Sequence, residues 1–221
     1  MCDSSFVVII SVLISFEITV ILPFNCPKDF TRFEKILGVI PTAFIDKKTF
    51  YTGNTDEPVT LECIMKCRKN ETCAGFLLNY EVPACYFYET ITDNDGQMTN
   101  EIDNNIVWFS KICVQGTIPA EKLCKEEWIF ERISGATLIG NNTKTLPKKV
   151  TRDACQKKCL EEKSFSCRSI KFRKTKEKQG NMTLGTCSLS SADRHAMPFA
   201  YRASNYQDEY IDNSCATDNF Q

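Results

Sequence analysis

The sequence has little of what most catalytic and nucleic-acid-binding schemes require. Among 221 residues there is one histidine, His195, so a general base for a Ser or Cys nucleophile has a single candidate. Lys and Arg number 27 against 28 Asp and Glu, which argues against a general polyanion-binding protein. No glycine-rich phosphate loop is followed by Lys-Ser or Lys-Thr. We therefore expect no catalysis and no nucleic-acid partner.

Long apolar runs are missing everywhere except at the N-terminus. Residues 6–16 form an apolar run with the length of a signal-peptide core, too short to span a bilayer. We interpret residues 1–24 as a signal peptide that is cleaved. An uncleaved anchor is the alternative, but it would place Glu17 inside the membrane at a cost of a few kcal/mol. The expected location is extracellular, in a matrix or cuticle, with no membrane insertion after cleavage.

Cysteine, by contrast, is abundant, with 13 residues, and such a content is typical of secreted proteins rather than cytosolic enzymes. Loss of Cys2 with the signal peptide leaves an even number in two sets of six. The rival interpretation is structural zinc, which favours Cys-x2-Cys knuckles and often histidine. The helical pairs here are Cys-x3-Cys, so we expect disulfides, no metal and no cofactor. The two sets are Cys26, Cys63, Cys67, Cys73, Cys85, Cys113 and Cys124, Cys155, Cys159, Cys167, Cys187, Cys215.

The two sets belong to two copies of one sequence pattern. Each copy opens with a cysteine and then Phe-Glu-(Lys/Arg)-Ile-x-Gly, at residues 33–38 and 130–135. A Cys-x3-Cys pair, a third cysteine and a final pair at equal spacing follow in both copies. We read a tandem repeat of about 90 residues. The expected organisation is a signal peptide (1–24), a first module (25–113), a linker (114–123), a second module (124–215) and a C-terminal tail (216–221).

Local patterns predict one helix and a small sheet in each module. Thr151 and Asp153 suit the start of a helix over residues 154–162, and Pro58 suits the first position of a helix over 61–66. The Cys-x3-Cys spacing places both sulfurs on one helical face. Residues 168–173 alternate between polar and apolar side chains and residues 84–89 are aromatic, as in strands. The fold class is therefore α+β.

This pattern of cysteines, helix and strands resembles PAN/Apple domains over residues 26–113 and 124–215. The second copy, with its segments 154–160, 185–190 and 208–215, is most similar to the PAN modules of invertebrate cuticular and apical-matrix proteins that also carry a zona pellucida domain. No zona pellucida domain follows in this sequence, so we expect either a short secreted relative or a truncated gene model. The resemblance implies two disulfide-rich modules, each an antiparallel sheet packed on one helix.

The resemblance also implies how the cysteines pair, which spacing alone leaves open among fifteen arrangements per module. Each outermost pair joins the ends of its module, and the two helical cysteines bond to two strands. The implied disulfides are Cys26–Cys113, Cys63–Cys85 and Cys67–Cys73 in the first module, and Cys124–Cys215, Cys155–Cys187 and Cys159–Cys167 in the second.

Two further features concern the surface. Three sequons, at Asn70, Asn141 and Asn181, lie in polar connections and indicate N-glycosylation. The segment 171–178 is basic and is a candidate hairpin tip for polyanions, with the alternative of a solvated loop. The acidic stretch 208–209 is interpreted as solvated, and Phe172 as pointing inward. The candidate polyanion-binding residues are Lys171, Arg173, Lys174, Lys176 and Lys178.

We expect a secreted, non-enzymatic protein that binds extracellular protein or glycan partners through two disulfide-braced modules. Two other functions stay open: a structural component of a cuticle or apical matrix, and a secreted ligand or protease regulator. The identity of the ligand and the oligomeric state do not follow from the sequence.

Overall fold

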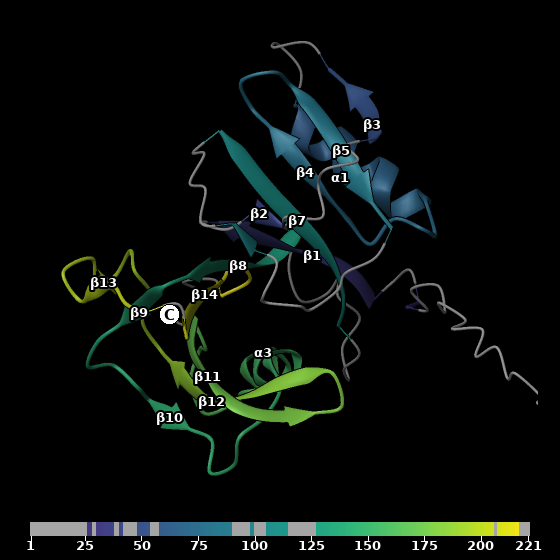
Figure 1. Cartoon of the computed structure of the whole chain (residues 1–221). Coiled ribbons are helices and arrows are strands. Elements are labelled where there is room, and N and C mark those ends of the chain that lie inside the picture. The colour runs from purple at the N-terminus through teal and green to yellow at the C-terminus, as the bar shows by residue number, and fades with distance from the viewer. Residues whose placement is uncertain are drawn as a thin grey trace, which may run out of the picture.

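The computed structural model describes residues 26–27, 30–37, 40–41, 48–53, 58–89, 98–99, 105–114, 127–205 and 207–216. It is an α+β structure in which two helices pack on a sheet of ten strands (Figure 1). The expected signal peptide and most of the expected linker and C-terminal tail lie outside these residues. Within the described ranges, no helix has the length and apolarity needed to cross a membrane.

The two modules have the same elements in the same order. The first has β1 (Thr31–Leu37), β2 (Ile40–Pro41), β3 (Lys48–Thr52), α1 (Val59–Lys69), β4 (Gly75–Asn79), β5 (Ala84–Tyr88), β6 (Met98–Thr99) and β7 (Ile106–Cys113). The second has β8 (Trp128–Ser134), β9 (Ala136–Leu138), β10 (Lys144–Thr145), α3 (Arg152–Leu160), β11 (Ser169–Gln179), β12 (Met182–Ser190), β13 (Tyr201–Ala203) and β14 (Asp208–Asn213). The tandem repeat therefore holds at the level of every described element.

The order of the strands in the sheet is symmetric about the junction of the two modules. Its order is β10-β12-β11-β14-β8-β1-β7-β4-β5-β3, so equivalent strands follow one another outward from β8 and from β1. Pairing is antiparallel within each module, as expected, whereas β1 and β8 pair in parallel. The sequence predicted two separate small sheets; the structure instead joins them edge to edge. The strands β2 with β6 and β9 with β13 form two separate ribbons.

The helices begin where local chemistry places them. Thr151 caps α3, because its hydroxyl accepts a hydrogen bond from the Ala154 amide at 3.3 Å. Pro58 lies one residue before α1, at the N-cap, rather than at its first position. Both Cys-x3-Cys pairs are buried, as the spacing predicted.

The two helices cover opposite faces of the sheet. Phe33 of β1 packs in the core beneath α1, with Phe76 and Phe109. The next residue, Glu34, points to the other face and lies beside Phe130 of β8, which packs in the core beneath α3. The modules are thus related by an approximate two-fold rotation about an axis along the junction strands.

Candidate functional site

The junction between β1 and β8 is the most elaborate polar site that the structure describes. Both strands come from the repeated Phe-Glu-basic-Ile sequence, and Lys35 lies opposite Glu131 in the parallel ladder. Side chains alternate along a strand, so Glu34 and Lys35 point to opposite faces. Glu34 and Lys35 therefore bring charge of opposite sign to opposite faces of the junction.

On the face that carries α3, Arg132 of β8 joins two carboxylates. Its Nε donates to Glu34 Oε2 at 3.1 Å, and its Nη1 donates to Glu209 Oε1 at 2.9 Å. Gln156 of α3 donates to the other oxygen of Glu34 at 2.6 Å. The Arg132 side chain is only 5% exposed. These contacts tie β1, β8, β14 and α3 together without water-exposed charge.

Glu209 is the most heavily paired acid of this cluster. Arg152 Nε donates to it at 2.7 Å, and Lys174 Nζ lies 3.1 Å from its Oε1. Burial alone would raise the pKa of Glu209, but the cations of Arg152, Arg132 and Lys174 outweigh burial and hold the pKa well below its usual range. The interpretation of residues 208–209 as a solvated acidic stretch is wrong, because Asp208 and Glu209 are both 0% exposed.

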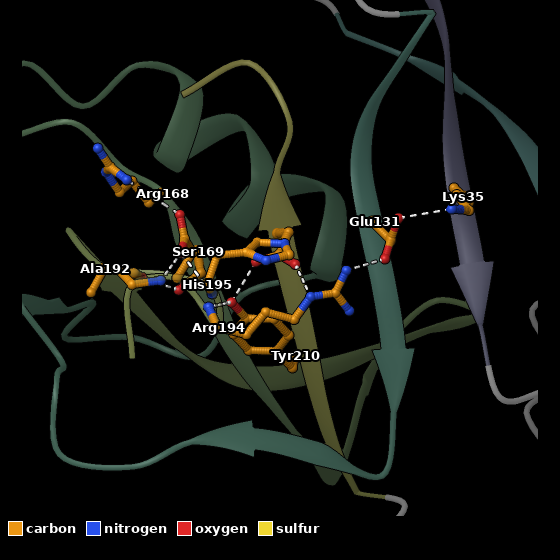
Figure 2. A network of polar contacts seen from close by, with 11 residues as sticks. Lys35, Glu131, Arg168, Ser169, Ala192, Arg194, His195 and Tyr210 are labelled. Atoms are coloured by element: carbon orange, nitrogen blue, oxygen red, sulfur yellow. Dashed lines mark hydrogen bonds and ion pairs between the residues drawn. The ribbon is translucent and has the colours of Figure 1, made fainter. Parts of the chain in front are cut away.

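The opposite face has a second network, which Figure 2 shows between β1, β8 and β14. Lys35 Nζ donates to Glu131 Oε2 at 3.0 Å, and Arg194 binds the other Glu131 oxygen. Arg194 Nε also lies 3.0 Å from Asp212 Oδ2, and the Tyr210 hydroxyl donates to Asp212 Oδ1. Burial raises the pKa of Tyr210 far above its usual value, and the neighbouring Asp212 carboxylate raises it further.

Apolar side chains also cross the junction. Trp128 of the second module packs edge-on against Phe109 of the first, with ring centroids 5.8 Å apart. Ile112 of the first module and Val114, the residue directly after its last strand, pack against the core of the second. Because each core includes side chains of the other module, the two modules are one folded unit.

The cysteines pair in the structure as the resemblance implied, wherever both partners are described. The disulfides are Cys26–Cys113, Cys63–Cys85, Cys67–Cys73, Cys155–Cys187 and Cys159–Cys167. Cys215 is also disulfide-bonded, and its expected partner, Cys124, lies outside the described residues. Cys63 and Cys155 thus fasten α1 and α3 to β5 and β12, as expected. Cys67 and Cys159 instead bond to cysteines that lie two residues before β4 and β11, not in a strand.

The five basic candidates of the hairpin β11–β12 differ in their pairing and exposure. Arg173 donates to Asp208 at 2.7 Å, and Lys174 pairs with the buried Glu209, so these two cations are already neutralised. Lys171 is half-buried in the strand, whereas Lys176 and Lys178 are exposed near the tip. This differs from the expected exposed tip, because β11 enters the sheet and carries Lys174 over the buried acid. Phe172 points inward and is buried, as predicted.

The sequons and the histidine lie at the surface. Asn70 and Asn181 are exposed and Asn141 is half-buried. The Asn70 carboxamide oxygen accepts hydrogen bonds from the amide and the hydroxyl of Thr72, both at 2.9 Å. His195 is exposed in a turn, where its backbone amide donates to Asp193 at 2.9 Å.

Comparison with known proteins identifies the family of this chain. The model of the PAN domain matches residues 43–113 and 124–215. The chain belongs to the PAN domain family. PAN domains are generally involved in protein or carbohydrate binding, and their disulfides are typical of extracellular proteins. Protein let-653 of Caenorhabditis elegans is 30% identical over 118 residues, which are 52% of this chain and 13% of that relative. The chain therefore spans a small part of the relative's length.

The residues that join the two PAN modules were not identified as a site from the sequence. The sequence did contain a feature that marks these residues, because Phe-Glu-basic-Ile is the part of the repeat that both copies share. The match to the first PAN module begins at residue 43, after β1, although β1 is the structural counterpart of β8. The adjacent acidic and basic residues that recur at this point of both repeats could have identified the site.

Proposed function

We propose that the chain is a secreted, non-catalytic extracellular protein that binds protein or glycan partners through two PAN modules acting as one rigid body. The observation that supports this most is the shared sheet, whose junction is fastened on both faces by Glu34–Arg132 and Lys35–Glu131. A partner that docks on a preorganised surface loses less conformational entropy than one that must first order two modules.

The symmetric strand order of the sheet also determines in which direction each module presents its surface. Because α1 and α3 cover opposite faces, equivalent surfaces of the two modules point in opposite directions. One chain is therefore suited to contact two partners on its two sides. Such bridging fits a role in an extracellular matrix or cuticle.

Three of the side chains with shifted pKa values are accounted for by structural ion pairs. Glu131, Glu209 and Arg194 belong to the paired networks on the two faces of the sheet, which explains their shifted pKa values. Every cysteine in the described part of the chain is oxidised, so none of these supplies a thiol nucleophile. These facts support a binding role over an enzymatic one.

The β11–β12 hairpin is the first surface to test for a partner. Its strands run to a two-residue turn at Gly180 and Asn181, where Gly180 takes a positive φ of 61°. The corresponding hairpin β4–β5 has a turn at residues 80–83 directly beyond the sheet, so the longer arm is specific to the second module. Lys176 and Lys178 near its tip favour an anionic partner such as a sulfated glycan.

The test measures binding of the mature chain to immobilised sulfated glycans and to extracellular matrix proteins at low and physiological salt. We expect saturable binding to sulfated glycan that weakens as the screening length falls to about 8 Å, and loss of that binding in K176S/K178S. The matched control is K157S/K158S, which removes two exposed charges on α3 and should bind normally.

An equal loss of glycan binding in both variants would mean that the attraction is nonspecific. Binding of the chain to matrix proteins but not to sulfated glycan would mean that the binding site lies outside the hairpin. Absence of saturable binding to either class would contradict the proposed function. Concentration-dependent assembly without any partner would favour the structural alternative instead.

A further inference from the structure

The contacts that hold the two modules together lie in their strands and helices, not in the connection between them. β1 and β8 pair in parallel (Figure 1). Glu34 binds Arg132 at 3.1 Å on one face of these strands, and Lys35 binds Glu131 at 3.0 Å on the other. Each pair joins one side chain of β1 to one of β8. The same contacts are therefore available between β1 of one chain and β8 of a second copy.

The connection is longer than the junction requires. β7 ends at Cys113, opposite the first residue of β1, and β8 begins at Trp128, opposite the third. The connection thus has to cross two strand spacings and two residues along the sheet, about 12 Å in all. Residues 115–123, which precede the expected disulfide of Cys124 with Cys215, extend to about 30 Å. The length of the connection therefore does not restrict β8 to the β1 of its own chain.

An open junction leaves surfaces that favour pairing with another chain. β1 and β8 would become sheet edges with unpaired amides and carbonyls. Trp128, which packs on Phe109, and Ile112, which packs against the core of the second module, would meet water. Two open chains remove these surfaces when each β1 pairs with the β8 of the other chain. The product is a closed dimer with the same two junctions as two monomers.

We propose that the β1–β8 junction is an exchangeable interface, whose partner is either the second module of the same chain or that of a second copy. A tethered module has an effective concentration on the order of 1 mM, so the chain closes on itself at micromolar concentration. Exchange sets in when the concentration of chains approaches the millimolar range. The dimer is closed and discrete, which distinguishes it from the open-ended assembly of a structural polymer.

The test uses two variants with opposite charge changes at one buried ion pair. Glu34→Lys places a cation against Arg132, and Arg132→Glu places a carboxylate against Glu34, so each variant repels the junction strand of its own chain. In a mixture of the two variants, exchange pairs the altered β1 with the altered β8 and leaves the original pair at the second junction. When the two are co-secreted with different tags, we expect a one-to-one heterodimer at micromolar concentration, captured through both tags.

Two controls accompany this mixture. A single chain with both changes, Glu34→Lys and Arg132→Glu, restores attraction within the chain and should be a monomer like the wild type. Two differently tagged copies of Glu34→Lys are the matched control, because every exchanged junction between them brings like charges together. They should form no dimer. Absence of the heterodimer from the mixture, or an equal amount of dimer in the matched control, would overturn the proposal.

The wild-type chain supplies a measurement that does not depend on how the variants fold. Its sedimentation equilibrium should change from monomer at micromolar concentration to dimer with a midpoint on the order of 1 mM. A monomer throughout this range, or growth beyond the dimer, would also overturn the proposal. Binding to sulfated glycan is measured on the monomer at micromolar concentration, so neither result decides the other.

Discussion

Replacement of Arg132 by methionine tests the energetic role of the junction. Methionine keeps much of the buried aliphatic volume but removes the guanidinium that binds Glu34 and Glu209. After the change, Glu209 still has Arg152 and Lys174, whereas Glu34 loses its described ion pair and keeps the hydrogen bond from the neutral amide of Gln156. The Glu34 carboxylate would then be buried without the cation that binds it in the described structure.

The expected loss of unfolding free energy is large because the Glu34–Arg132 ion pair is shielded from water. Removing one partner of a buried ion pair costs about 3–5 kcal/mol, which corresponds to a fall in Tm of about 6–20 °C in a chain of this size. Adding Glu34→Gln to Arg132→Met should recover part of this loss, since it removes the uncompensated charge.

The assay is denaturant unfolding with all disulfides intact. Lys158→Met is the control, because Lys158 is 57% exposed and its surface pair with Glu161 contributes at most about 1 kcal/mol. A loss below about 1 kcal/mol for Arg132→Met, or no recovery in the double variant, would refute the assignment of this cluster as the fastening of the two modules.

Three further predictions concern acid stability, the disulfides and the fragment. The lowered pKa of Glu209 means that its stabilisation is complete above the usual pKa of a glutamate and declines as pH falls toward the folded value. The difference in unfolding free energy between the wild type and Glu209→Gln should therefore be constant above about pH 5 and shrink below it; a difference that grows at low pH would contradict the sign. The mature chain should contain no titratable thiol, and Cys155→Ala should destabilise by about 2–5 kcal/mol in thermal unfolding or fail to be secreted. Residues 124–215 alone should unfold at a lower temperature than the intact chain and self-associate in sedimentation, because β8 becomes a free edge; a monomer as stable as the intact chain would show that the modules are independent.

Local patterns predicted the features that depend on nearby residues. The helix face of Cys155 and Cys159, the cap at Thr151 and the inward orientation of Phe172 follow from spacings of two to four residues. The family resemblance supplied the disulfide pairing. These parts of the fold could be predicted without knowing how the two modules pack together.

The junction did not follow from the same reasoning because its partners are distant in sequence. Glu34 and Arg132 look like solvent-facing residues of an amphipathic strand, and alternation does not reveal whether the polar face meets water or a second charged strand. Glu209 and Lys174 were misjudged for the same reason, since Glu209 becomes buried and paired with Lys174 only when β11, β14 and α3 pack together.

Residue-level hydrogen exchange of β1 and β8 measures most directly whether the two PAN modules form one unit. Each strand directs alternate amides toward its own module and toward the junction. If the sheet is continuous, both sets of amides in both strands should exchange slowly and to a similar degree. Fast exchange confined to the amides that face the junction would show two separate modules with free edges, and would contradict the continuous ten-stranded sheet.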